Sequence, residues 1–244
     1  MADLSGRDDR LAGPSPGPRR AFRAPSAWLT LICVFAIGLG ADLFSKSWSF
    51  RHVAGAPVVL DRERLLSEPG YDPIRWHPRK AVLPGRLMDF KLVLNPGAVF
   101  GIGANQRLFF IAFTVAALGA GLLVFGRFTT ARDRAAHVAL GLILAGGLGN
   151  LYDRLVFGRV RDFIQVLPGR RLPNGWTWPG SDNPEMFPWV FNVADVLLLV
   201  GMIVLMVHIN RRETSVRGLA GETSVTGDED VGGTDLRTPE LPRG

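Results

Sequence analysis

The chain alternates between long apolar runs and polar stretches rich in turn residues. Four runs carry no Asp, Glu, Lys or Arg, at residues 27–41, 108–126, 135–152 and 196–209. A bilayer core of about 30 Å is crossed by about 20 mostly apolar helical residues, so the second and third runs are long enough alone. The first reaches that length by continuing to Phe50, and the fourth only if Asp195 lies inside its helix. The pattern predicts an α-helical membrane protein with four transmembrane helices.

The first run has a second interpretation. An arginine-containing tail followed by an apolar stretch of this length also describes a secretory signal peptide. The continuation through Trp48 and Phe50 favours a retained membrane anchor.

The polar segments predict three regions. Residues 1–25 and 211–244 lack the apolar content to form a core, and we expect both to be disordered tails. Residues 26–210 should form the membrane domain, with loops at about 51–106 and 154–189.

The two loops have sequence features of their own. In the first, residues 56–60 and 87–94 are typical of strands, which predicts a small β-sheet at the membrane surface. In the second, Trp176, Trp178 and Trp189 suit the interfacial belt of a membrane protein.

Composition narrows the possible partners and cofactors. The net charge of +6 in a chain with four membrane runs favours an anionic lipid surface over nucleic acid. The single cysteine, Cys33, excludes an intrachain disulfide. The four histidines show no His-Glu-x-x-His spacing, so we expect neither a metal nor a cofactor; they are His52, His77, His137 and His208.

Asp162 and Asp195 are placed where the chain meets the bilayer. A carboxylate at membrane depth costs roughly 2.5 to 3.5 kcal/mol, so it marks a candidate functional site unless a structural partner explains it. If the two converge to about 4 Å, their charges repel by about 4 kcal/mol at an effective dielectric of 20. They would then share one proton, as the carboxyls of an aspartic peptidase do.

Asparagines accompany both helix ends near these acids. Asn150 and Asp153 are three residues apart and share a helical face, and Arg154 can pair with a carboxylate; a polar helix end with a surface ion pair explains them equally well. Asn192 and Asp195 repeat the spacing. An N-cap role accounts for Asn192 but not for Asp195, one turn farther in.

Two further polar groups flank the apolar runs. Asp42 and Lys46 lie four apart, which favours a structural ion pair. Asn95 precedes a Pro-Gly bend that could present it to the membrane surface, although a plain turn explains Pro96 and Gly97 equally well.

Together these segments resemble the type II lipoprotein signal peptidases, which are membrane-embedded aspartic peptidases of bacteria. The matching stretches are residues 42–46, 95–100, 149–154, 160–164 and 191–195, and they occur in the family's order. The resemblance covers roughly residues 27–210. It implies an enzyme that removes the signal peptide of a prolipoprotein by cutting on the amino side of a diacylglyceryl-modified cysteine.

The resemblance also implies roles for single residues. Asp162 and Asp195 match the catalytic dyad, and Asp42 and Lys46 match a pair assigned to stability. The positions that match substrate-positioning pocket residues are Asn95, Asn150, Asp153, Arg154 and Asn192. The family places both tails in the cytoplasm and the sheet and active site on the outer side of the bacterial inner membrane. We expect a monomer whose partners are prolipoproteins and membrane lipids.

Two features of the sequence depart from the usual pattern of the family. The segments at about 54–86 and 168–188 are longer than is typical of the family, and Val99 stands where a small alanine is common.

The principal alternative is a transporter or proton-relay protein, because intramembrane carboxylates also line ion pathways. Inverted repeats with interrupted helices would indicate it, and the sequence shows none.

Overall fold

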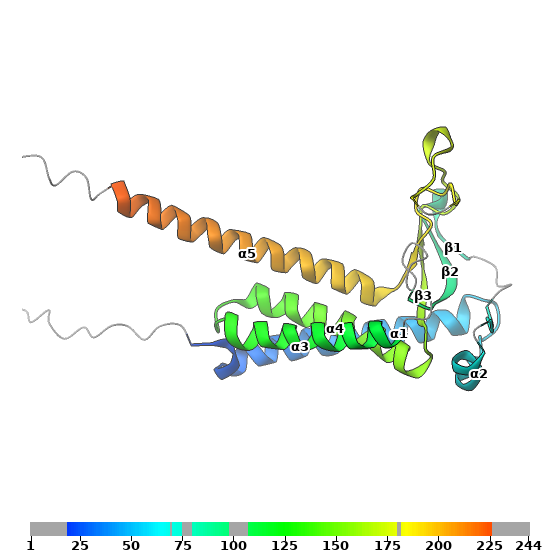
Figure 1. The fold of residues 1–244 in the computed structure, drawn as a ribbon, viewed down its shortest axis with the longest axis horizontal. Coiled ribbons are helices and arrows are strands. Elements are labelled where there is room, and N and C mark those ends of the chain that lie inside the picture. The colour runs from blue at the N-terminus through cyan, green and yellow to red at the C-terminus, as the bar shows by residue number, and fades with distance from the viewer. Residues whose placement is uncertain (1–18, 69, 75–79, 98–106, 180–181, 226–244) are drawn as a thin grey trace, which may run out of the picture. The chain divides into compact units, whose positions relative to one another are not determined.

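The computed structural model describes residues 19–68, 70–74, 80–97, 107–179 and 182–225, with side chains to residue 214. Among these residues, four helices are long and apolar enough to cross a membrane, which confirms the predicted architecture (Figure 1). They are α1 (Pro25–His52), α3 (Arg107–Phe128), α4 (Arg134–Val156) and α5 (Val193–Val225). The chain divides into two compact units at Leu205, and every contact below lies in the first.

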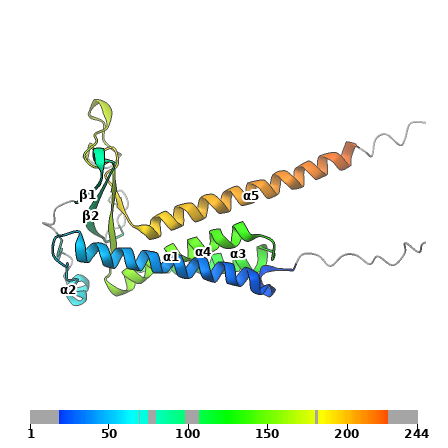
Figure 2. The same cartoon turned by 180° about the vertical axis from the view of Figure 1, so that it is seen from behind.

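Helix α4 is the most buried of the four, and α1 and α3 run beside it (Figures 1 and 2). Glycines permit its close approach to two neighbours. A Cβ on Gly146 would collide with the main-chain oxygen of Ala194 in α5, and one on Gly149 would collide with the carboxylate of Asp42 in α1. Small residues therefore let the helix backbones come together here, as they commonly do in membranes.

A small antiparallel sheet stands at one end of these helices. Its strands follow the order β1 (Lys80–Leu83), β2 (Met88–Asn95), β3 (Val160–Val166) and β4 (Val190–Phe191). The remaining short elements are η2 (Ala21–Arg23), α2 (Arg62–Ser67), η3 (Pro84–Arg86) and η4 (Pro173–Gly175).

The strand predicted at residues 87–94 is confirmed as β2, but the one predicted at 56–60 is wrong. Pro57 has no N–H for a ladder. Val58 donates its N–H to Phe50 O at 2.9 Å, and the side chains of Val58 and Leu60 pack on a hydrophobic cluster. The apolar residues of this segment therefore reflect its packing on the cluster and not pairing with another strand.

That cluster joins the sheet to the end of α1. Phe50 contributes from the helix, Leu92 and Leu94 from β2, and Phe163 from β3, all of them buried. Each such side chain contributes roughly 1.5–3 kcal/mol by leaving water. The cluster fixes the sheet against the helix that carries Asp42 and Lys46.

The structure extends order into both segments expected to be tails. Residue Ala21 is fully buried, and its N–H donates to Thr129 O at 3.0 Å, so residues 19–24 pack on the last turn of α3. At the other end, α5 continues as helix to Val225, past the boundary expected at residue 210. The polar composition after residue 210 predicted that this segment has no hydrophobic core. A polar segment can still be helical when it continues an existing helix.

Candidate active site

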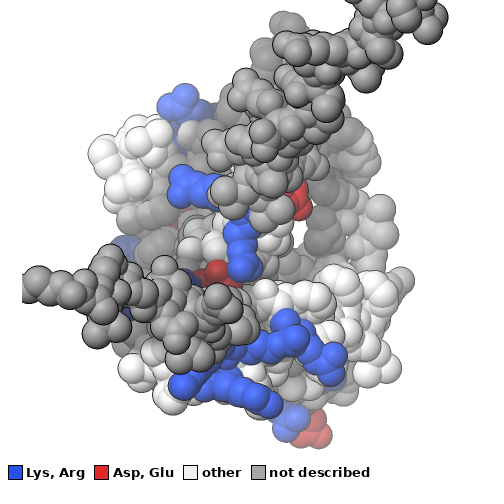
Figure 3. Space-filling model, turned by 90° about the vertical axis from the view of Figure 1, so that its left-hand side faces the viewer, with Lys and Arg blue, Asp and Glu red and all other residues white. Residues whose placement is uncertain are grey.

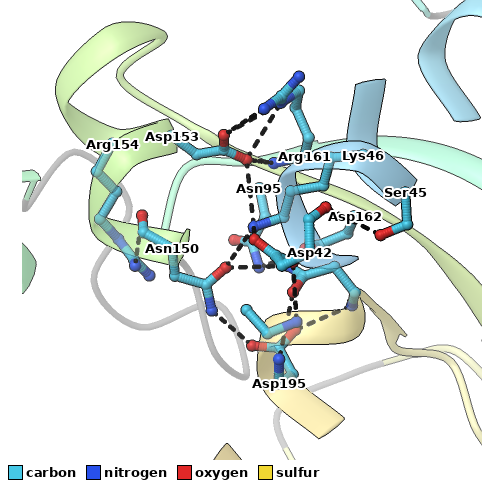
Figure 4. Close-up of polar contacts among 12 residues, drawn as sticks. Asp42, Ser45, Lys46, Asn95, Asn150, Asp153, Arg154, Arg161, Asp162 and Asp195 are labelled. Atoms are coloured by element: carbon cyan, nitrogen blue, oxygen red, sulfur yellow. Dashed lines mark hydrogen bonds and ion pairs between the residues drawn. The ribbon is translucent and has the colours of Figure 1, made fainter. Parts of the chain in front are cut away.

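Strand pairing brings the two aspartates of interest into one region. Asp162 lies in β3, and β4 leads directly into α5, which carries Asp195 in its first turn. The pairing of Ile164 with Phe191 sets Asn192 beside Asp162. The Asn192 Nδ2 donates to Asp162 Oδ1 at 2.6 Å. Both predicted acids therefore belong to one hydrogen-bonded cluster (Figure 4).

The start of α5 is a reciprocal cap. Asp195 N donates to Asn192 Oδ1 at 3.2 Å, and Asn192 N donates to Asp195 Oδ2 at 3.1 Å. This is the arrangement of a capping box, with Asn192 at the N-cap and Asp195 three residues on. The N-cap interpretation of Asn192 is confirmed. The statement that capping does not involve Asp195 is wrong, because its side chain returns to the N-cap N–H.

Three asparagine amides point their NH2 groups at the aspartates. Asn95 Nδ2 donates to Asp162 Oδ2 at 3.0 Å, and Asn150 Nδ2 donates to Asp195 Oδ1 at 2.8 Å. Asn192 Nδ2 is shared between Asp162 Oδ1 and Asn150 Oδ1, at 2.6 and 3.1 Å. The carboxylates thus receive donors from β2, α4 and the N-cap of α5.

Each asparagine is held in this orientation because a donor occupies its oxygen. Gly97 N donates to Asn95 Oδ1 at 2.9 Å, Lys46 Nζ to Asn150 Oδ1 at 3.0 Å, and the N-cap oxygen of Asn192 accepts from Asp195 N. A flipped amide would set an NH2 group against a donor. The network therefore allows only one assignment of amide nitrogen and oxygen.

Behind the asparagines lies a chain of alternating charges. Lys46 Nζ lies 2.8 Å from Asp42 Oδ2 and 3.5 Å from Asp153 Oδ2. Arg161 donates to the Asp153 carboxylate through Nε and through Nη2, the latter at 2.8 Å. All four side chains are buried. The predicted Asp42–Lys46 pair is confirmed, and Asp42 Oδ1 also accepts from Ala194 N at 2.9 Å, so α1 caps α5.

Arg161 is a member of this chain that the sequence did not indicate. It adjoins Asp162 in β3 and therefore points to the opposite face of the sheet, toward Asp153. Alternation along the strand could have separated the two roles. The partner on the far face, however, comes from α4 and is not visible in the local sequence.

Arg154 differs from the prediction. Its Nη1 donates to the main-chain oxygen of Asn150 at 3.3 Å, and its guanidinium lies 5.2 Å from the centre of the Phe110 ring. Asp153, the adjacent carboxylate, is taken by Arg161 instead. The helix turn directs residues 153 and 154 to different sides of α4, which keeps Arg154 near the aspartates without a direct ion pair.

The environment of Asp162 favours its neutral form. Burial raises the pKa of Asp162 to about 7, and the charge of Asp195 acts in the same direction; hydrogen bonds from Asn95 and Asn192 oppose both. Asp162 is 2% exposed, whereas Asp195 is half-buried. The pair can therefore hold one proton near neutral pH, with the more accessible oxygen atoms on Asp195. In the described part of the chain, no three His, Cys, Asp or Glu side chains are grouped to hold a metal ion.

Sequence comparison agrees over most of the chain. The sequence model of the signal peptidase (SPase) II family matches residues 34–211. A lipoprotein signal peptidase of Anaeromyxobacter sp. (strain Fw109-5) is 31% identical over 201 residues, covering 78% of this chain and 87% of the relative. One of Rhodopirellula baltica is 33% identical over 209 residues, covering 80% and 79%.

Structural comparison finds the same fold. Two solved structures of a bacterial membrane enzyme each give a TM-score of 0.52 at 21% identity. They cover 81% of this chain and 94% of the neighbour in one case, and 78% and 96% in the other. From these matches and the fold, the chain is a multi-pass membrane protein of the signal peptidase II family, a family of membrane aspartic proteases.

Proposed function

We propose that Asp162 and Asp195 are the catalytic dyad of an endopeptidase that removes signal peptides from prolipoproteins. The cut falls on the amino side of a diacylglyceryl-modified cysteine. Membership of the family supports the reaction, and it does not favour the transporter alternative. The observation that carries the assignment is the shared asparagine network, in which one amide group of Asn192 contacts Asp162 while its backbone is bonded to Asp195.

The two acids divide the chemistry by their surroundings. Asp162, with its raised pKa, keeps the proton and donates a hydrogen bond to the carbonyl oxygen of the scissile peptide. Asp195 is more exposed than Asp162, so we assign to it the role of the base that takes a proton from the attacking water. As the tetrahedral intermediate collapses, the proton gained by Asp195 passes to the leaving nitrogen. Neither carboxyl forms a covalent bond to the substrate.

The remaining polar residues position this pair. Asn95, Asn150 and Asn192 orient the carboxylate oxygens, Asp153 holds the buried charge chain behind them, and Arg154 contributes positive charge beside the substrate path. We place the enzyme in the inner membrane, with both ends of the chain in the cytoplasm and the sheet on the opposite side. A monomer contains all of the side chains named here.

Cleavage of a lipidated precursor by the purified chain tests the assignment. Asp162→Asn and Asp195→Asn should insert and fold but leave the precursor uncut, whereas the exposed carboxylate variant Asp182→Asn should cleave like the wild type. Asn at position 195 retains an oxygen for the cap, so loss of cleavage cannot be ascribed to loss of α5. A chelator should leave the rate unchanged. Processing that survives either substitution would remove that residue from the dyad.

A further inference from the structure

A cavity of about 870 Å³ lies at the end of the helices away from the sheet. It is formed where η2 packs on the last turns of α3. Its lining combines four arginines with apolar residues: Arg19, Arg20, Arg23, Arg127, Phe22, Leu122, Leu123 and Gly126. Figure 3 looks onto this end and shows several basic side chains, and a few acidic ones, among uncharged residues. The cavity is remote from Asp162, and the proposed reaction does not use it.

The arginines stand on a fixed support. Ala21 N donates to Thr129 O at 3.0 Å, and Ala131 N donates to Arg19 O at 2.9 Å, so residues 19–21 are tied to the end of α3. The indole of Trp28 donates to Phe22 O at 3.0 Å. The backbone that bears the arginines of η2 is therefore held by hydrogen bonds. The lining residues of the cavity include no acidic residue.

The apolar half of the cavity belongs to the lipid-facing surface. Phe22 is 63% exposed, and Leu122 and Leu123 are 47% and 53% exposed. Helix α3 has 22 residues, which at about 1.5 Å per residue makes it about 33 Å long, close to the hydrocarbon thickness. Leu122 and Arg127 consequently lie where acyl chains give way to head groups.

We propose that this cavity binds the head group of an anionic phospholipid from the leaflet at this end of the helices. The guanidinium groups of Arg23 and Arg127 pair with the phosphate, for which arginine supplies several N–H donors in one plane. The first segment of an acyl chain lies along Leu122, Leu123 and Phe22. A soluble phosphate compound would leave that apolar wall uncovered, which is why the lipid is the better fit.

Binding can be measured by thermal unfolding of the full chain in neutral detergent during titration with phosphatidylglycerol. The lipid should raise the Tm of the wild type, because it binds only the folded protein. Phosphatidylcholine and inorganic phosphate should not raise it at the same concentrations. The double variant Arg23→Gln/Arg127→Gln should bind phosphatidylglycerol about 30-fold more weakly, since each basic residue near an anionic surface contributes about a fivefold factor.

Two controls keep the result specific. Arg170→Gln/Arg171→Gln removes two exposed arginines from the loop near the sheet and should leave lipid binding unchanged. Arg23→Lys/Arg127→Lys keeps the charge and should retain most of the affinity. Native mass spectrometry of bound lipid provides a readout that does not depend on stability. Equal binding of phosphatidylglycerol by the glutamine variant, or equal protection by inorganic phosphate, would overturn the proposal.

Discussion

At the residue scale, Asp162 combines deep burial with a negatively charged neighbour. Its pKa of about 7 means that the proton needed for catalysis is lost as the pH rises through neutrality. We expect kcat/KM for precursor cleavage to fall above about pH 7. Cleavage rates measured between pH 5 and 9 would contradict this account if they rose through pH 8.

The same shift predicts a stability effect with a defined sign. The folded-state pKa of Asp162 lies above the unfolded value of about 3.9, so the folded protein binds more protons between these values and loses stability as the pH rises through them. Asp162→Asn removes this loss. The Tm of the variant minus that of the wild type should therefore be larger at pH 8 than at pH 4. A pH-independent difference would refute the assignment of the shift to Asp162.

Lys46 is a positioning residue for Asn150. Its ammonium occupies Asn150 Oδ1 at 3.0 Å and so directs the amide NH2 to Asp195. We expect Lys46→Met to lower kcat by about 10²-fold or more with little change in KM, the signature of an interaction made in the transition state. Assays belong at a temperature where the variant is folded, because the substitution leaves the buried Asp42 carboxylate without its cation.

A matched variant separates positioning from stability. Asp42→Asn weakens the same buried cluster but leaves the Lys46 ammonium on Asn150. It should lower the Tm while preserving more of kcat than Lys46→Met does. Equal losses of kcat in the two variants at matched folded fraction would show that Lys46 acts through stability alone.

At the scale of elements, close contact between α4 and α5 holds the first turn of α5 in place. Gly146→Ala would drive a methyl group against the main-chain oxygen of Ala194 and against Cγ and the main-chain nitrogen of Leu198, none of which is the end of a flexible side chain. We expect destabilisation of about 1–3 kcal/mol, as in other overpacked sites. The Tm should fall, and cleavage should fall with it because Ala194 adjoins Asp195.

Gly119 in α3 supplies the control for that substitution. A Cβ there meets nothing within 4 Å, so Gly119→Ala gains helix propensity without a clash. Its Tm should equal or exceed that of the wild type. Similar losses for the two alanine variants would show that glycine flexibility, rather than close approach, matters at position 146.

At the scale of the whole molecule, the sequence predicts what depends on composition and local spacing. Four uncharged runs suffice to place the membrane helices, and the Asn192–Asp195 spacing indicates a helix start. The partners across elements were not predictable in this way. Arg161 meets Asp153 only because β3 folds back beside the end of α4, and Asp42 caps Ala194 across 152 residues of sequence.

Errors in the sequence interpretation have the same origin. Residues 56–60 form a short apolar run typical of a strand, yet Val58 and Leu60 pack on a hydrophobic cluster that other elements form. Arg154 does not pair with the adjacent Asp153, because the guanidinium of Arg161 occupies that carboxylate. Resemblance to a family indicated the candidate positions, whereas the structure was needed to determine which atoms contact each other.

The central claim is that Asp162 and Asp195 act as one unit. The most direct measurement compares single-turnover precursor cleavage by the two asparagine variants with that of the double variant. A shared proton and a shared water predict a loss of about 10⁴-fold for either single change and no further loss for the double, because members of one catalytic unit are strongly non-additive. Modest single losses that multiply in the double variant would contradict the account.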